Sequence, residues 1–178
     1  MRTGPDDVLK LEIFAGNIVE VPADVLVSTA NPWLQMTGGV NLAIIVRPKG
    51  DDVFGELQEF LRATGKKMVD PGTVVCTGPG SLPVKKILHA VSIDPSYDSS
   101  IELVTKTIVS ALSQARQLNA RIVTLAALAT GFGPLLMEDF ARALQEALRL
   151  DWSPLEILKV VVKHEEEASK IRAILGVA

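Results

Sequence analysis

The hydrophobic positions of this chain form short apolar runs that alternate with longer segments in which apolar residues recur three and four positions apart. The short runs predict buried strands at 9–14, 25–28, 73–76, 86–91, 121–126 and 156–163. The longer segments predict helices that follow residues 38, 50, 98, 133 and 164. This alternation predicts an α/β fold, with a largely parallel sheet covered by helices on both faces.

Three of the predicted helices have recognisable ends. Pro48 ends the first helix, because proline cannot continue the ladder of backbone hydrogen bonds. Ser99, with Glu102 three positions later, predicts a capping box at the start of the longest helix. Glu165 to Glu167 stand in the first turn of the last helix, where acidic residues favour the helix dipole. We therefore interpret these acids as a helix start and not as catalytic residues.

Length and composition indicate a soluble globular protein. The 178 residues are a one-domain length, 48% of them are hydrophobic, and no apolar run is long enough to span a membrane. A net charge of −3 with 4% aromatic residues argues against a nucleic-acid-binding protein. The N-terminal residues show no secretory signal, so we expect a single domain over residues 1–178, located in the cytoplasm.

One cysteine and two histidines provide few ligands for a metal. Cys76 lies in an apolar strand and is interpreted as a small core residue. His89 lies in the apolar run 87–91 and is expected to be a hydrogen-bonded core histidine. The sequence therefore predicts neither a metal site nor a disulfide framework.

Two glycine-containing loops follow predicted strands and precede predicted helices. The first extends from Thr37 to Asn41 and the second from Ala129 to Gly133. Glycines at such places let backbone N–H groups turn toward a ligand, and ligands of parallel sheets bind at the carboxyl ends of strands. Two such loops facing each other would form a clamp for a diphosphate. For the second loop, the alternative is an ordinary strand-to-helix turn with Phe132 packed in the core.

Several short motifs occur in an order that resembles the macro domain family. They are Gly16-Asn17-Ile18, the run from Ala23 to Asn31, Gly38-Gly39-Val40, the run from Ile87 to Val91, and Ala129-Thr130-Gly131-Phe132-Gly133. The resemblance extends from about residue 9 to the C-terminus. It implies a three-layer α/β/α sandwich with a central, mostly parallel mixed sheet, and it implies ADP-ribose as the ligand.

The resemblance also implies roles for individual residues. Asn17 and Ile18 would face the adenine, and Asn31 would lie near the distal ribose. The residues that would grip the diphosphate are Thr37, Gly38, Gly39, Val40 and Asn41 in the first loop, and Ala129, Thr130, Gly131, Phe132 and Gly133 in the second. The expected partner is ADP-ribose or a related small-molecule nucleotide, including ADP-ribose attached to a protein. No cofactor is expected.

The chain departs from the family at several of these positions. Asn17 stands where the family has an acid, and Ser28 stands where it has an asparagine. Hydrolytic members of the family have an aspartate and a histidine where this chain has Asn41 and Ile45, neither of which can act as a general base. We therefore expect binding of ADP-ribose without efficient turnover.

Two other functions are compatible with the sequence. The first is hydrolysis of an ADP-ribosyl ester, an O-acetyl-ADP-ribose ester or ADP-ribose 1''-phosphate, through a water positioned by Asn31 and Asn41. The chain would then be an ADP-ribosyl hydrolase or an ADP-ribose phosphatase. The second is an interaction module that retains the fold and has lost the ligand.

Overall fold

A six-stranded sheet forms the centre of the molecule, in the order β1-β6-β5-β2-β4-β3. The structure is a computed structural model and describes residues 8–178. The strands are β1 (Lys10–Ala15), β2 (Val25–Ala30), β3 (Val74–Thr77), β4 (Lys86–Val91), β5 (Ile122–Ala126) and β6 (Ile157–Val162). Neighbouring strands are parallel except for β3, which runs antiparallel to β4. The predicted mostly parallel, mixed sheet is confirmed.

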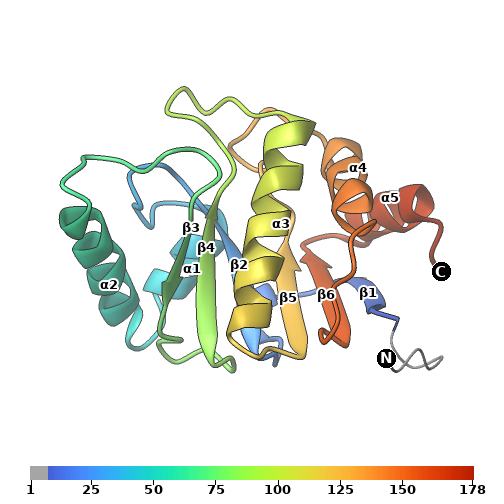
Figure 1. Cartoon of the computed structure of the whole chain (residues 1–178), viewed down its shortest axis with the longest axis horizontal. Helices are drawn as coiled ribbons and strands as arrows, with labels where there is room; N and C mark the ends of the chain where they lie inside the picture. The colour runs from blue at the N-terminus through green and yellow to red at the C-terminus, as the bar shows by residue number, and fades with distance from the viewer. Residues whose placement is uncertain (1–7) are drawn as a thin grey trace.

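Helices cover both faces of this sheet (Figure 1). One layer contains α1 (Gly39–Ile45) and α2 (Gly50–Ala63), and the other contains α3 (Ile101–Gln117), α4 (Met137–Ala147) and α5 (Glu165–Leu175). A short 3-10 helix, η1 (Ile18–Glu20), follows β1. In Figure 1, α3 crosses in front of the sheet and α1 lies behind it. The predicted three-layer α/β/α sandwich is therefore confirmed.

Most strand residues are apolar, and helices cover both faces of the sheet. On β2, Val25 and Val27 pack in the core beneath α3, whereas Leu26 packs in the core beneath α1 and α2. The apolar stripe of α3 is completely buried and consists of Val104, Ile108, Ala111, Leu112 and Ala115. Burial on both faces explains why the strands appear in the sequence as continuous apolar runs. Within residues 8–178, no helix combines the length and the apolar character needed to cross a membrane.

The start of α3 differs by one residue from the prediction. Ser100, and not Ser99, is the N-cap, and its Oγ accepts the N–H of Leu103 at 3.1 Å. The Ser99 hydroxyl donates instead to the carbonyl oxygen of Ser92 at 2.5 Å. Because this bond holds Ser99 against the end of β4, the next serine is left to cap the helix.

The interpretation of Cys76 as a core residue is wrong, since the cysteine is exposed. It lies on β3, an edge strand with a neighbour on one side only. Polar residues of α3, including Ser110 and Gln114, line a shallow groove beside it. An apolar strand pattern predicts burial of both faces, but at this edge no apolar helix face covers the cysteine.

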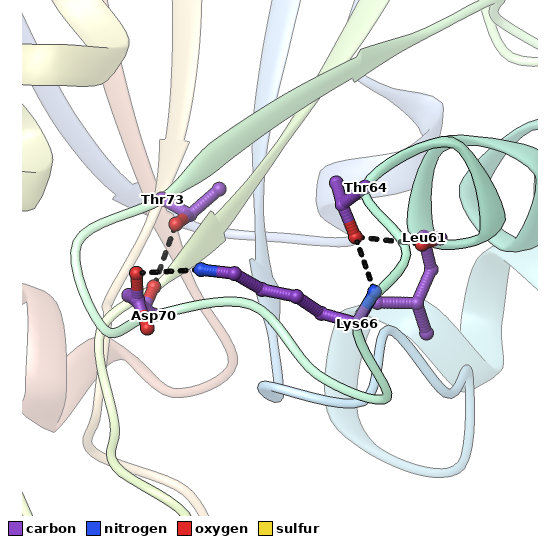
Figure 2. Close-up of polar contacts among 5 residues, drawn as sticks. All are labelled: Leu61, Thr64, Lys66, Asp70 and Thr73. Carbon is purple, nitrogen blue, oxygen red and sulfur yellow. Dashed lines mark hydrogen bonds and ion pairs between the residues drawn. The ribbon is translucent and has the colours of Figure 1, made fainter.

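Side-chain hydrogen bonds hold the loop between α2 and β3 (Figure 2). Thr64 Oγ1 donates to the carbonyl oxygen of Leu61 at 2.7 Å and accepts the N–H of Lys66 at 3.2 Å. Further along, Thr73 Oγ1 donates to the carbonyl oxygen of Asp70 at 2.6 Å, and Lys66 Nζ lies 3.5 Å from the Asp70 carboxylate. These bonds give partners to polar groups that no helix or strand satisfies.

Asp24 joins three segments at the amino-terminal edge of the sheet. Its Oδ2 accepts the N–H groups of Arg121 at 2.8 Å and Ile122 at 2.9 Å, and its Oδ1 lies 2.7 Å from Lys85 Nζ. Burial acts to raise the pKa of this carboxyl, but the bonds from Lys85, Ile122 and Arg121 outweigh it and lower the pKa to about 2. The folded chain therefore stabilises the ionised form of Asp24.

We predict that Asp24→Asn lowers the free energy of unfolding at neutral pH by about 1–3 kcal/mol, because hydrogen bonds to a charged group are lost. The pKa of Asp24 is depressed on folding, so the contribution of the carboxylate is fully present above about pH 4 and declines as the pH falls toward 2. Urea unfolding of both proteins at several pH values from 7 down to 3 measures this difference. A difference that stays constant over the whole range would contradict the assigned role.

Candidate functional site

A cleft of about 470 Å³ opens at the carboxyl edge of the sheet. Its lining includes the first residue after each of five strands, namely Gly16 after β1, Lys163 after β6, Ala127 after β5, Asn31 after β2 and Ser92 after β4. The spatial order of these strands makes the cleft run from the β1 side of the sheet to the β4 side. This edge is where open α/β sheets bind their ligands.

All but one of the predicted site residues line this cleft. They are Ile18, Asn31, Thr37, Gly38, Gly39, Val40, Asn41, Ala129, Thr130, Gly131, Phe132 and Gly133. Asn17 is exposed and lies outside the lining, between Gly16 and Ile18, which both belong to it. The fold therefore brings the two glycine loops, which are far apart in the sequence, into one cavity.

The first glycine loop enters α1 with its backbone donors unoccupied. The N–H groups from Gly38 to Asn41 donate to no acceptor within residues 8–178. Gly39 has a φ of +57°, in the left-handed region that favours glycine. Consecutive N–H groups of this kind can receive an anionic group of a ligand.

The second glycine loop reaches across the cleft to the first. The Phe132 ring lies against Gly38, where an added Cβ would come within 2.3 Å of Phe132 Cε2. Phe132 is 74% exposed, so the alternative that packs it in the core is wrong. In the part of the chain that the structure describes, the N–H groups of Thr130, Gly131 and Gly133 have no acceptor. Both loops therefore present unoccupied donors to the same cavity.

Ala129 sets the shape of the second loop. Its φ of +61° costs a residue other than glycine on the order of 1 kcal/mol. Its carbonyl oxygen accepts the N–H of Leu135 at 3.3 Å, and Thr130 Oγ1 donates to the carbonyl oxygen of Ala127 at 2.9 Å. Because the Thr130 proton is used within the loop, this hydroxyl can only accept a hydrogen bond from a ligand.

Asn31, expected near the distal ribose, and Asn41, expected in the loop that grips the diphosphate, are both held by protein groups. Asn31 Oδ1 accepts the N–H of Gln35 at 3.1 Å, and its Nδ2 donates to the Gln35 carbonyl oxygen at 3.0 Å. Asn41 is buried, and its Oδ1 accepts the Ser28 hydroxyl at 2.9 Å. Ser28 therefore fixes the orientation of the Asn41 side chain.

Few titratable side chains reach the cleft. Those in its lining are Tyr97, Lys163 and Glu167. The Glu167 carboxylate accepts the N–H groups of Lys163 at 3.1 Å and His164 at 3.0 Å. Across residues 8–178, no three His, Cys, Asp or Glu side chains are grouped so that they could hold a metal ion. Negative charge on a ligand would therefore be stabilised mainly by backbone dipoles.

His89 is the buried core histidine that the sequence predicts. It is completely buried on β4, and its Nε2 lies 3.0 Å from Thr77 Oγ1. Burial lowers the pKa of His89 to about 3, so the ring is neutral at physiological pH. His89 is not part of the cleft lining, and its role is therefore structural.

Sequence reasoning missed several residues of the cleft lining. Gln35, Ser92 and Ile93 belong to the lining, although none of them lies in a glycine loop. Ser92 and Ile93 come directly after β4. Their place after a predicted strand is the signal that could have found them, and the same rule finds Asn31 and Lys163.

Gly133 and Gly131 provide a matched pair of alanine substitutions in the second loop. A Cβ on Gly133 would lie 2.4 Å from the carbonyl oxygen of Ala129, whereas a Cβ on Gly131 would meet nothing within 4 Å. We predict that Gly133→Ala lowers the free energy of unfolding by at least about 1 kcal/mol, and that Gly131→Ala changes it by less than about 0.5 kcal/mol. Chemical denaturation without ligand measures both values. Equal losses would be inconsistent with the loop geometry.

Comparison with known proteins points to one family. The model of the Macro domain matches residues 27–144 of this chain. An uncharacterized protein of Aquifex aeolicus is 32% identical over 160 residues, which cover 89% of this chain and 92% of that protein. An uncharacterized protein of Mycobacterium tuberculosis is 28% identical over 142 residues, which cover 80% of this chain but only 38% of that protein.

Solved structures of macrodomains are also similar to this chain. The Oceanobacillus iheyensis macrodomain with ADP has a TM-score of 0.83 and 25% identity, over 99% of this chain and 94% of that one. A mutant of the same macrodomain with ADPR (ADP-ribose) has a TM-score of 0.84 and 24% identity, over 99% and 96% of the two chains. Since the family model covers more than half of the sequence, this chain belongs to the Macro domain family.

Proposed function

We propose that this chain binds ADP-ribose, or a related ADP-ribosyl nucleotide, in the cleft and does not turn it over efficiently. The observation that carries the proposal is the pair of loops that meet at Phe132 and Gly38, with N–H groups that lack an acceptor in the described chain. A diphosphate is a group whose charge such donors would satisfy. The Oceanobacillus iheyensis macrodomain supports this choice, because its structures contain ADP or ADPR.

In this proposal the ligand extends along the cleft, with the adenine at the side of β1 and β6. Ile18, Val161 and Val162 supply apolar contacts for the base at this side. The diphosphate lies between the two glycine loops, and the distal ribose lies next to Asn31 and Phe132. The strand order supports this direction, since β2 lies farther from β1 than β6 does.

The lack of turnover follows from the absence of a free general base in the described lining of the cleft. Asn41 has no basic group, and its Oδ1 already accepts the hydroxyl of Ser28. Ile45, which stands where hydrolytic relatives have a histidine, has no basic group and is not part of the lining. The one carboxylate in the described lining, Glu167, is occupied by two N–H groups. The proposed role is therefore recognition of ADP-ribose, free or attached to a protein. Release of phosphate or removal of ADP-ribose at more than a trace rate would contradict it.

Thermal unfolding with and without ADP-ribose tests the proposed binding. A ligand at a hundred times its Kd adds about 2.7 kcal/mol to the free energy of unfolding, which raises the Tm by roughly 5–11 °C for a domain of this size. AMP and ribose 5-phosphate lack the diphosphate and serve as controls with smaller expected rises. No rise in millimolar ADP-ribose would contradict the proposal and support a ligand-free interaction module.

A charged variant in the second loop shows where the ligand binds. Gly131→Glu places a carboxylate at a position whose Cβ meets nothing within 4 Å, so the unliganded Tm should change little. Repulsion between this carboxylate and the diphosphate should remove the rise caused by ADP-ribose. Gly55→Glu is the matched control, because its Cβ on α2 is equally unobstructed and lies outside the cleft. A rise that survives Gly131→Glu would contradict the assigned position of the diphosphate.

Asn17 provides a test of the position of the adenine. We predict that Asn17→Asp lowers the Kd of ADP-ribose by up to about tenfold, because a carboxylate accepts the exocyclic amino group more strongly than an amide does. An analogue with hypoxanthine in place of adenine has a carbonyl oxygen instead of this amino group, so Asn17→Asp should not lower its Kd. Isothermal titration calorimetry measures the Kd of each of the two ligands for each of the two proteins. An unchanged or higher Kd for ADP-ribose would argue against the adenine assignment.

A further inference from the structure

The β4 end of the cleft contains groups that the proposed binding of ADP-ribose does not use. Ser92, directly after β4, and Tyr97, in the loop that follows, line this end, and Gln35 is a further residue of the cleft lining. β4 lies beyond β2 and Asn31 in the order of the sheet. The adenine, the diphosphate and the distal ribose are assigned to the part between β1 and β2. The lining at β4 is therefore left for a group attached to the distal ribose.

Ser92 is a largely buried residue whose hydroxyl has no partner in the described part of the chain. It is 2% exposed, and its Oγ forms no hydrogen bond with any other residue between 8 and 178. Its carbonyl oxygen accepts the Ser99 hydroxyl, and this bond fixes the backbone at the end of β4. Because Ser92 lines the cleft and its hydroxyl is not bonded by any residue between 8 and 178, this hydroxyl is available to a polar group of a ligand.

Tyr97, the only tyrosine in the chain, places an aromatic ring at the same end of the cleft. Its ring centroid lies 6.0 Å from that of Trp33, with an angle of 37° between the two planes. This arrangement is within the range of favourable aromatic pairs. Because Tyr97 remains 43% exposed, Trp33 supports the ring without covering it, and a planar group can stack on it.

Asp94 holds the loop that carries Tyr97. Its Oδ1 accepts the N–H groups of Ser96 at 2.7 Å and Asp98 at 2.9 Å, and its carbonyl oxygen accepts the N–H of Tyr97 at 3.0 Å. Tyr97 has a φ of +61°, a conformation that costs on the order of 1–3 kcal/mol and is concentrated at ligand sites. The position of the ring is therefore set by the loop before a ligand arrives.

The charges around this end favour a neutral or cationic group over an anionic one. Lys163 is the one basic residue in the described lining, and it follows β6, away from β4. Asp94 and Asp98 flank Tyr97 instead. A phosphate attached to the distal ribose would have no positive partner at this end.

We propose that Tyr97 and Ser92 form a subsite for a planar aromatic carboxamide joined to the distal ribose, so that the cleft binds intact oxidised nicotinamide adenine dinucleotide. The pyridinium ring stacks on Tyr97, whose π face attracts its positive charge. The carboxamide forms hydrogen bonds with the Ser92 hydroxyl and the Gln35 amide. The inference rests on the proposed function, because this dinucleotide contains the whole of ADP-ribose, and it involves no bond making or breaking.

Calorimetric titration of the whole chain with ADP-ribose and with the oxidised dinucleotide tests this subsite. The expected Kd of the dinucleotide is no higher than that of ADP-ribose. Tyr97→Asn removes the ring with a residue that tolerates a positive φ, and it should raise the Kd of the dinucleotide about fivefold or more. The Kd of ADP-ribose should stay within about twofold. Tyr97→Phe keeps the ring and is the matched control, so the Kd of the dinucleotide and the Kd of ADP-ribose should both be unchanged.

Ser92→Ala tests the hydroxyl separately from the ring. It should raise the Kd of the dinucleotide about fivefold, through the loss of one hydrogen bond, and leave the Kd of ADP-ribose unchanged. A Kd for the dinucleotide more than about tenfold above that of ADP-ribose, or an equal effect of Tyr97→Asn on both ligands, would overturn the subsite and leave the proposed function standing. Failure of both ligands to bind would overturn both proposals. Unliganded thermal unfolding verifies that each variant is folded.

Discussion

The parallel register of five strands is the constraint on which the rest of the molecule depends. β1, β6, β5, β2 and β4 run in one direction, so the residues that follow them all meet at one edge of the sheet. Helical layers bury both faces of the strands and hold this edge in place. Two loops that are distant in the sequence become walls of one cleft, and Phe132 contacts Gly38 where they meet.

The cleft offers backbone N–H donors in place of charged side chains. Side chains in the two loops can therefore change without removing the groups proposed to bind the ligand. An N–H group is present whichever side chain the residue carries, so these loops can also contain residues other than glycine, such as Thr37 and Ala129. The conformation of Ala129 is less favourable than it would be for glycine, because its φ is positive. Side-chain chemistry is more sensitive: Asn41, fixed by Ser28, presents an amide oxygen and no base. Within the proposed function, recognition would therefore persist where catalysis is lost.

The fold could be predicted because apolar runs, helical periodicity and glycine loops are local signals. The residues whose surroundings depend on distant segments could not. Cys76 is exposed because the part of α3 beside it presents mainly polar residues such as Ser110 and Gln114. Ser100 caps α3 because Ser99 bonds to Ser92, a contact that neighbouring residues do not encode. The sequence is compatible with two positions of Phe132, since only the approach of the first loop decides where its ring lies.

The central claim is that backbone N–H groups of both loops hold the diphosphate of the ligand. A two-dimensional proton–nitrogen NMR titration with ADP-ribose observes these groups directly. The account predicts that the amide signals of Gly38, Gly39, Gly131 and Gly133 move together along one saturation curve, because the new acceptor is shared by both loops. The amide of Arg121, which is bonded to Asp24 at the opposite edge of the sheet, should not move. Loop amides that stay in place at saturating ligand, or shifts confined to one loop, would contradict the account.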